Sequence, residues 1–121
     1  MPSRRDLESY LSQQQLQVGV EETNGFQHVY YIYKNSKISV TEGLANNTEP
    51  VVSDEYIAWV RTPYGTNQSL LYVHNVLDRT TTQITSFGNA SKPDIYGNHL
   101  VWEDDSAETA SVYFYDGLSV Q

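Results

Sequence analysis

Cysteine is absent from the 121 residues of this sequence, and so are long apolar runs. Without cysteine there are no disulfides, no thiolate zinc sites and no cysteine nucleophiles. The apolar stretches are only a few residues long, whereas a helix that crosses a bilayer needs about 20, so we predict no membrane span. Basic residues number 7 against 15 acidic ones, which gives a formal net charge of -8. Such a surface repels phosphate backbones, so nucleic acid is not an expected partner.

Signatures of catalysis are missing as well. The sequence has no Gly-x-Ser-x-Gly elbow, no His-Glu-x-x-His helix and no glycine-rich phosphate loop. We therefore predict that the protein is not an enzyme and has no catalytic residue, no metal ligand and no cofactor. The residues that bind a partner stay unassigned at this point.

Residues 3–16 are rich in Gln, Ser, Arg and Glu and contain neither glycine nor a β-branched residue, which favours a helix. Ser3 and Asp6 have the spacing of a capping box. One helical face carries the apolar residues Leu7, Tyr10 and Leu11. We expect this face to pack on the rest of the chain, while a partner helix or a preceding domain are alternatives.

From Leu16 onward the sequence is typical of an all-β protein. Val, Ile, Tyr and Thr occur in runs of four to six, separated by clusters of Asn, Gly, Ser and Pro. Ten tyrosines and two tryptophans supply bulky side chains. Alternating with aliphatic residues, they can fill the space between stacked sheets.

An internal repeat is the strongest pattern in the sequence. Residues 49–60 align over residues 92–103 without a gap, so Trp59 and Trp102 stand 43 positions apart. The prolines near the start of each copy keep the same interval, and a partial copy precedes both. The other matched ranges are 71–75 with 112–116, 20–22 with 102–104, 31–33 with 113–115, and 38–41 with 82–85.

Each full unit contains four short strands, in the order Pro-x-Val/Ile, Ile/Leu-x-Trp, x-Tyr-x-x-Asn/Asp and Gln-Ile-Thr. Asp54-Glu55 and Gly97-Asn98 stand between the first two strands of their units. Tight hairpins at these places need residues that tolerate positive φ, and these residue types do. Four antiparallel strands make one β-propeller blade.

The third unit carries a family resemblance. Pro-Asp-Ile-Tyr-Gly-Asn-His-Leu-Val-Trp-Glu-Asp, followed by Val-Tyr-Phe-Tyr-Asp, resembles the TolB-type β-propeller repeats common in archaeal and bacterial cell-surface proteins. The resemblance covers about residues 17–121. It implies a partial propeller of two and a half to three blades in units 17–48, 49–91 and 92–121, placed outside the cytoplasm or at a cell surface. Propellers of this type serve as protein docking surfaces, carbohydrate-facing modules and lids of peptidases.

The blade count is too small for a closed ring. The first unit lacks an opening strand, and the third stops at Gln121 before its closing strand. Known propellers close with at least about four blades. We therefore expect either a piece of a longer propeller or a ring closed by several copies, with an open twisted array as a further alternative.

Histidines and carboxylates are the candidate metal ligands. His28, His74 and His99 fall in corresponding or adjacent strands of different units, where strand alternation scatters them. Residues 103–105 form an acidic cluster that could hold Ca²⁺, and Glu21-Glu22 occupies the equivalent place in the first unit. The second unit has Val60-Arg61 at that place, and no EF-hand spacing accompanies the cluster. A solvated loop is therefore the favoured interpretation.

Two further patterns are relevant to glycan binding and to glycosylation. Trp59 and Trp102 could stack on sugars if exposed, but their repeated position among aliphatic residues favours packing between blades. Three N-glycosylation acceptor patterns begin at Asn46, Asn67 and Asn89, all in predicted loops. They agree with a secreted protein.

The leading hypothesis is a non-catalytic module for binding or assembly. A β-propeller scaffold would present loops or a central face to a protein or glycan whose identity the sequence does not give. Self-association through the end blades or the N-terminal helix is a further expectation. The alternatives are an accessory propeller segment of a larger hydrolase and a purely structural repeat array.

Overall fold

Strands dominate the computed structural model, which describes residues 2–97, 99–104 and 111–115. One short helix, α1 (Arg4–Leu11), precedes them among the described residues. The strands are β1 (Val18–Thr23), β2 (Phe26–Tyr33), β3 (Ser36–Ser39), β4 (Ala45–Ser53), β5 (Tyr56–Pro63), β6 (Leu70–Asn75), β7 (Thr80–Gln83), β8 (Ala90–Tyr96), β9 (His99–Asp104) and β10 (Ser111–Tyr115). The expectation of an all-β chain with a short N-terminal helix is confirmed.

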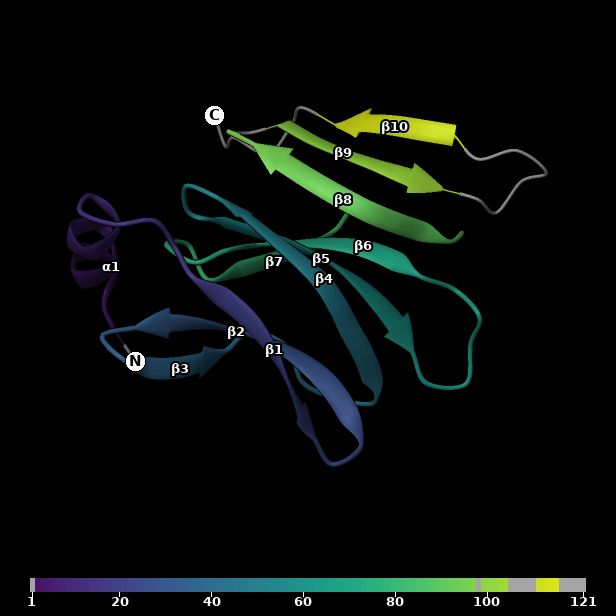
Figure 1. Ribbon diagram of the computed structural model, residues 1–121, viewed down its shortest axis with the longest axis horizontal. Helices are drawn as coiled ribbons and strands as arrows, with labels where there is room; N and C mark the ends of the chain where they lie inside the picture. Colours follow the sequence, from purple (N-terminus) through teal and green to yellow (C-terminus); the bar gives the residue numbers. More distant parts are fainter. Residues whose placement is uncertain (1, 98, 105–110, 116–121) are drawn as a thin grey trace.

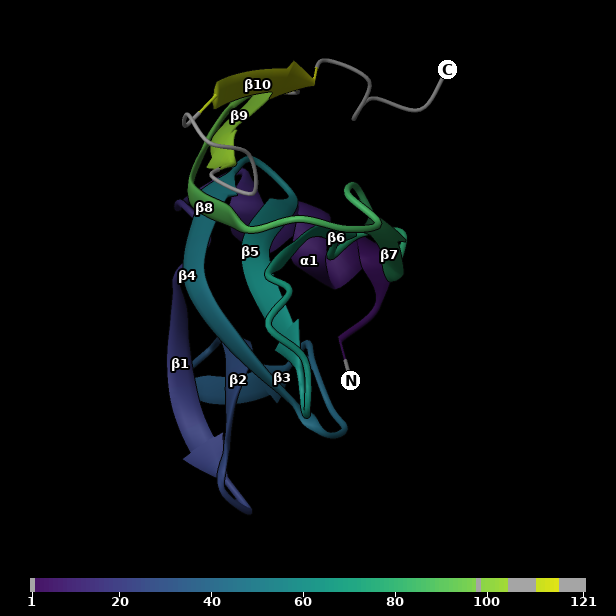
Figure 2. The same ribbon diagram turned by 90° about the vertical axis from the view of Figure 1, so that its right-hand side faces the viewer.

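Three antiparallel sheets follow one another along the chain. The first sheet has the order β1-β2-β3, the second β4-β5-β6-β7 and the third β8-β9-β10. Figure 1 shows the sheets lying one over another, and in Figure 2 β1, β4 and β8 run along one side of the stack. Because each strand pairs with its neighbour in sequence, short turns suffice to build every sheet.

The helix α1 packs on its own chain, as expected. Its predicted capping box is present, with the Asp6 amide donating to Ser3 Oγ at 3.1 Å and the Ser3 amide donating to Asp6 Oδ2 at 3.3 Å. Leu7 is buried among residues of the first two sheets, and the Tyr10 ring centroid lies 4.9 Å from that of Tyr33. The helix ends at Leu11, earlier than the predicted residue 16. No helix of the described ranges is long and apolar enough to span a membrane.

The second sheet is buried on both faces. Five consecutive residues of β5, from Tyr56 to Val60, are buried. Ile57 and Trp59 belong to a core shared with the first sheet and α1, whereas Tyr56 and Ala58 belong to a core shared with the third sheet. Strand alternation explains this division, because successive side chains point to opposite faces.

The same packing is used twice. In the third sheet Leu100 and Trp102 occupy the places of Ile57 and Trp59, and they pack on the second sheet. Each tryptophan-bearing face thus covers the preceding sheet. Trp59 is 1% exposed and Trp102 is 7% exposed, so both are core residues, as their repeated position predicts. Neither indole face is open to a sugar.

A bulge marks the first strand of the second and third sheets. Strand register shifts between Thr48 and Val51 in one and between Ser91 and Asp94 in the other. In each bulge the residue before proline has a positive φ, 56° at Glu49 and 51° at Lys92. Proline cannot donate a ladder hydrogen bond, so a bulge is where a strand tolerates it.

The two bulges also join neighbouring sheets, because the Lys92 amide donates to Glu49 Oε1 at 3.0 Å. The hairpin turns of the second and third sheets are also equivalent, because Asp54 and Gly97 both have a positive φ. β4 begins at Ala45 and β8 at Ala90, ahead of the starts of the aligned units. The 43-residue spacing read from the sequence therefore recurs in the backbone geometry.

The alignment of the first unit is wrong by one residue. Trp59 pairs with Tyr72 and Trp102 pairs with Tyr113, but the equivalent pair in the first sheet is Gly19 with Tyr30. The predicted equivalents were residues 20 and 31. A one-residue slip exchanges the two faces of a strand. Residues 30–33 read Tyr-Tyr-Ile-Tyr, so bulky residues occur on both faces and the pattern could not fix the register.

The closing part of that alignment is confirmed. The Val29 amide donates to Thr41 Oγ1 at 3.1 Å, and the Leu71 amide donates to Thr85 Oγ1 at 2.9 Å. Thr41 and Thr85 were matched by sequence, and they end their sheets in the same way. A threonine hydroxyl thus replaces the next ladder bond at both places.

The outer face of the first sheet carries polar groups. Gly19 stands where the other sheets have tryptophan, and the Tyr30 ring lies over it, since a Cβ at Gly19 would come within 2.6 Å of Tyr30 Cζ. Lys37 Nζ lies 4.8 Å from the Tyr30 ring centroid and 3.2 Å from Glu21 Oε1. The hydrogen bond to Glu21 raises the pKa of Lys37.

Replacement of Leu7 by alanine tests the docking of the helix. We expect the free energy of unfolding to fall by about 2–5 kcal/mol, because a buried leucine leaves a cavity. Urea denaturation measures the change, and the exposed Ser9→Ala on the same helix is the matched control. Light scattering of the folded Leu7→Ala protein should give the wild-type mass; a changed mass would mean that Leu7 joins copies of the chain.

Gly19→Ala tests the contact between Gly19 and Tyr30. The added methyl displaces the tyrosine ring, and we expect a loss of about 1–3 kcal/mol of unfolding free energy. In a Tyr30→Ser background the same substitution should cost less than half as much, because the clash is gone. Equal costs in the two backgrounds would show that the ring does not lie over Gly19.

Candidate binding site

The three histidines do not converge. His28 lies in β2, His74 in β6 and His99 in β9, one in each sheet. The Nδ1 atom of His28 lies 3.0 Å from Thr41 Oγ1, and that of His74 lies 2.9 Å from Thr81 Oγ1. Over residues 2–97, 99–104 and 111–115, no group of three or more His, Cys, Asp or Glu side chains could hold a metal ion.

The described members of the acidic cluster after Trp102 contact neighbouring residues of the third sheet and the segment that leads into it. Asp104 Oδ1 accepts a hydrogen bond from the Asn89 amide at 3.2 Å, and Glu103 lies 3.9 Å from Lys92 Nζ. Asp105, the third member of the predicted cluster, lies outside the described residues. In strand register Asp104 corresponds to Arg61 in the second sheet and to Glu21 in the first.

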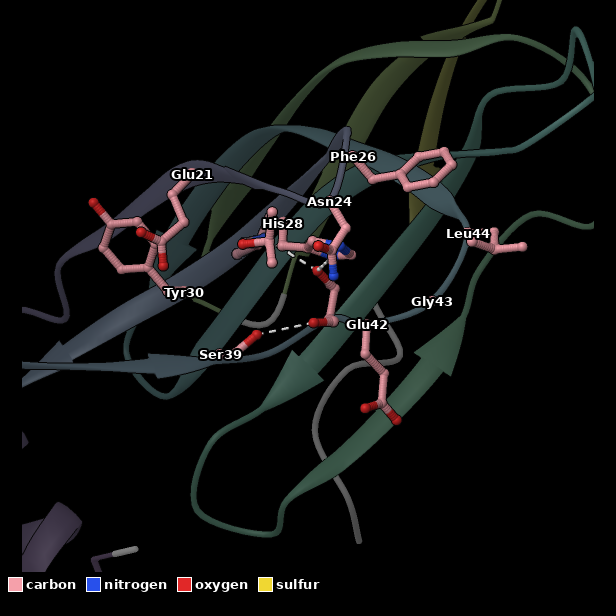
Figure 3. A pocket seen from close by; sticks show the side chains of 12 residues that line it. Glu21, Asn24, Phe26, His28, Tyr30, Ser39, Glu42, Gly43 and Leu44 are labelled. Atoms are coloured by element: carbon pink, nitrogen blue, oxygen red, sulfur yellow. Dashed lines mark hydrogen bonds between the residues drawn. The ribbon is translucent and has the colours of Figure 1, made fainter.

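A pocket of about 430 Å³ opens at the end of the first sheet. β1 and β2 form one wall, and the connection from β3 to β4 forms the other (Figure 3). The lining includes the polar side chains of Glu21, Asn24, His28, Tyr30, Ser39 and Glu42. The lining formed by described residues includes no lysine or arginine, so the pocket offers hydrogen-bond acceptors and hydroxyls to a ligand.

Apolar side chains that are exposed or half-buried lie beside this pocket. Phe26 and Leu44 line one side of it, as Figure 3 shows, and Tyr64 extends the rim. The ring centroids of Phe26 and Tyr64 are 5.7 Å apart in an edge-to-face arrangement. Tyr64 is 73% exposed and Leu44 is 68% exposed. We call Phe26, Leu44 and Tyr64 the apolar rim.

The apolar rim comes from three separate connections that the fold holds together. Phe26 begins β2, Leu44 precedes β4 and Tyr64 follows β5. The Tyr64 amide donates to the Leu44 carbonyl at 2.9 Å, which fixes two of these segments to each other. The sequence analysis missed all three residues. A tyrosine in the Pro-Tyr-Gly turn was the one available signal, because an aromatic side chain in such a turn has no core to enter.

Asn47 is a buried residue that contacts Arg61, and the sequence analysis also missed it. Its amide group is fully buried and makes four hydrogen bonds: Nδ2 donates to the Gln27 and Ala45 carbonyls, and Oδ1 accepts from Trp59 Nε1 and Arg61 Nη1. Both contacts to Oδ1 are 3.0 Å long. A satisfied buried amide holds its neighbours in one geometry.

The glycosylation patterns fall in different settings. Asn46 lies within β4 and not in a loop, which corrects the prediction, and its Oδ1 accepts from the Gln27 amide at 2.9 Å. Asn67 is exposed in the connection between β5 and β6, as predicted. Asn89 directly precedes β8 and is half-buried. Of the three asparagines, only Asn67 is an exposed residue in a loop.

Comparison with known proteins gives no assignment for this site. No protein-family model matches the sequence, and no curated protein matches it. The function is therefore argued from the geometry of the described residues.

His74 predicts a dependence of stability on pH. Burial lowers the pKa of His74 from its ordinary value of 6.5, so the folded protein binds a proton there less readily than the unfolded chain. The free energy of unfolding should fall as pH drops below about 6.5 toward the lowered pKa of the folded state. Urea denaturation between pH 7.5 and 5.5 measures this slope, which His74→Gln should reduce. Parallel curves for the two proteins would contradict the prediction.

Proposed function

We propose that this protein is a non-catalytic binding module that holds a glycan at the apolar rim and the adjacent pocket. The observation that carries the proposal is an aromatic pair, the exposed Tyr64 and the half-buried Phe26, beside a cavity whose lining includes carboxylates, an amide and hydroxyls. Sugar rings present C–H faces that pack on aromatic side chains, and their hydroxyls pair with such polar groups. A protein partner is the alternative ligand class.

We further propose that the three sheets are blades of a TolB-like β-propeller that acts outside the cytoplasm or at a cell surface. Three observations support the propeller: the four-stranded order of the second sheet, the repeated packing of tryptophan-bearing faces, and the matching bulges. In this arrangement the rim and the pocket belong to the loops at one end of the blades. Loops on a rigid scaffold are frequent places for recognition.

Tyr64→Ser tests the proposed site. The side chain is exposed, so its loss should leave the urea midpoint unchanged while weakening binding of an oligosaccharide at least about tenfold. A glycan array identifies the oligosaccharide, and NMR titration then measures the dissociation constant. Phe26→Ala should weaken the same ligand.

The matched control is Tyr96→Ser. Tyr96 is 84% exposed and is the last residue of β8, at the opposite end of the strands from Tyr64. It should keep the wild-type affinity. Equal losses in the two serine variants, or no glycan bound by the wild-type protein on the array, would refute the assignment of this end as a glycan site.

A further inference from the structure

A second hollow adjoins the candidate pocket. It has a volume of about 280 Å³ and lies between the connection that leads into β4 and the strands β5, β6 and β7. Thr41 and Glu42 line both hollows, so a single ligand can occupy the two. Trp59, Tyr72 and Arg61 line its second-sheet side. Arg61 is the only cation among the described residues that line either hollow.

Neutral groups hold the Arg61 guanidinium in place. Nη1 donates to Asn47 Oδ1 and Nη2 donates to the Glu42 carbonyl, each at 3.0 Å. The group also lies over the Tyr72 ring, with Cζ 6.0 Å from the ring centroid. These contacts leave several of its N–H donors available. Because the guanidinium is already held in place, less side-chain conformational entropy is lost when a ligand binds to it.

Arg61 forms no ion pair with a carboxylate of the described residues, although Glu42 lines the same hollow. The ion pairs among the described residues involve Arg4, Lys37 and Lys92, and none involves Arg61. The equivalent positions in the other two sheets carry Glu21 and Asp104. The second sheet thus places a half-buried cation where its neighbours have acids, in a chain with a formal net charge of -8. A carboxylate ligand would complete a charge-assisted pair there.

We propose that Arg61 forms a carboxylate subsite and that the ligand is an acidic glycan of the uronic acid type. The sugar rings would occupy the candidate pocket and the apolar rim, and one carboxylate would reach Arg61 past Thr41 and Glu42. This inference deepens the proposed glycan site and rests on it. Gly43 lies next to the guanidinium, since a Cβ there would be 3.5 Å from Arg61 Nη2, in van der Waals contact.

The competing role for Arg61 is purely structural. In the third sheet Asp104 holds the residues that lead into β8 through the Asn89 amide, much as Arg61 holds the Glu42 carbonyl. A structural anchor would affect stability and the binding of every ligand alike. A carboxylate subsite instead changes the difference in affinity between an acid and its ester, so that difference is the readout.

The experiment compares trigalacturonic acid with its methyl ester, which keeps the rings and removes the charges. NMR titration of the full chain should give at least about tenfold tighter binding of the acid to the wild-type protein. Arg61→Gln should bind the acid no more tightly than the ester. Arg5→Gln, which removes an exposed arginine from α1, is the matched control and should keep the preference. Glu42→Gln should strengthen binding of the acid alone, because a like charge is removed.

The outcomes separate the two proposals. If Arg61→Gln keeps the preference, or if the wild-type protein binds acid and ester equally, the subsite is refuted while the glycan site stands. If neither sugar binds but acetate shifts the Arg61 Nε–Hε resonance, the glycan site fails and the carboxylate subsite is upheld. If triglutamate binds through Arg61 as tightly as the sugar acid, the assignment to a sugar is overturned.

Discussion

The buried contact between Trp59 and Asn47 links the core of this protein to its candidate site. Trp59 packs its indole into the core between the first two sheets, where its N–H needs an acceptor. Asn47 provides that acceptor and, through the same oxygen, accepts from Arg61. Packing of the sheets and placement of the loop end therefore depend on one amide group, and a change in either propagates to the other.

Stability and recognition are accordingly divided between the two ends of each strand. β5 illustrates the division, because Tyr56 to Val60 are buried and the residues that follow are half-buried or exposed. The interior of the strand is fixed by both neighbouring sheets. Its last residues carry Arg61 and lead to Tyr64, where side chains are free to meet a ligand. A strand with a buried interior thus holds the accessible residues at its end in place.

Local patterns were sufficient to predict most of the scaffold. The capping box, the strand runs, the hairpin turns and the 43-residue spacing all depend on residues close in sequence, and each is found in the structure. The register of the first sheet was not predictable in this way, because Gly19 gives no hydrophobic signal and the aromatic run of β2 fits both faces. Only the packing of Tyr31 against the second sheet decides between them. Phe26, Leu44 and Tyr64 were missed for a related reason: they come together through tertiary contacts between connections that differ in length and composition.

Gly19 gives the stack a direction. At both junctions between sheets a tryptophan packs on the preceding sheet. The outer face of the first sheet instead has the Tyr30 ring over Gly19, with the Lys37–Glu21 ion pair beside it. Packing of another sheet on this face would desolvate Lys37 and Glu21. The face also has no tryptophan that such a sheet could bury. The outer face of the first sheet is therefore polar, as the outer faces of end repeats in solenoid proteins are. Its polarity distinguishes this face from the tryptophan-bearing faces at the two junctions between sheets.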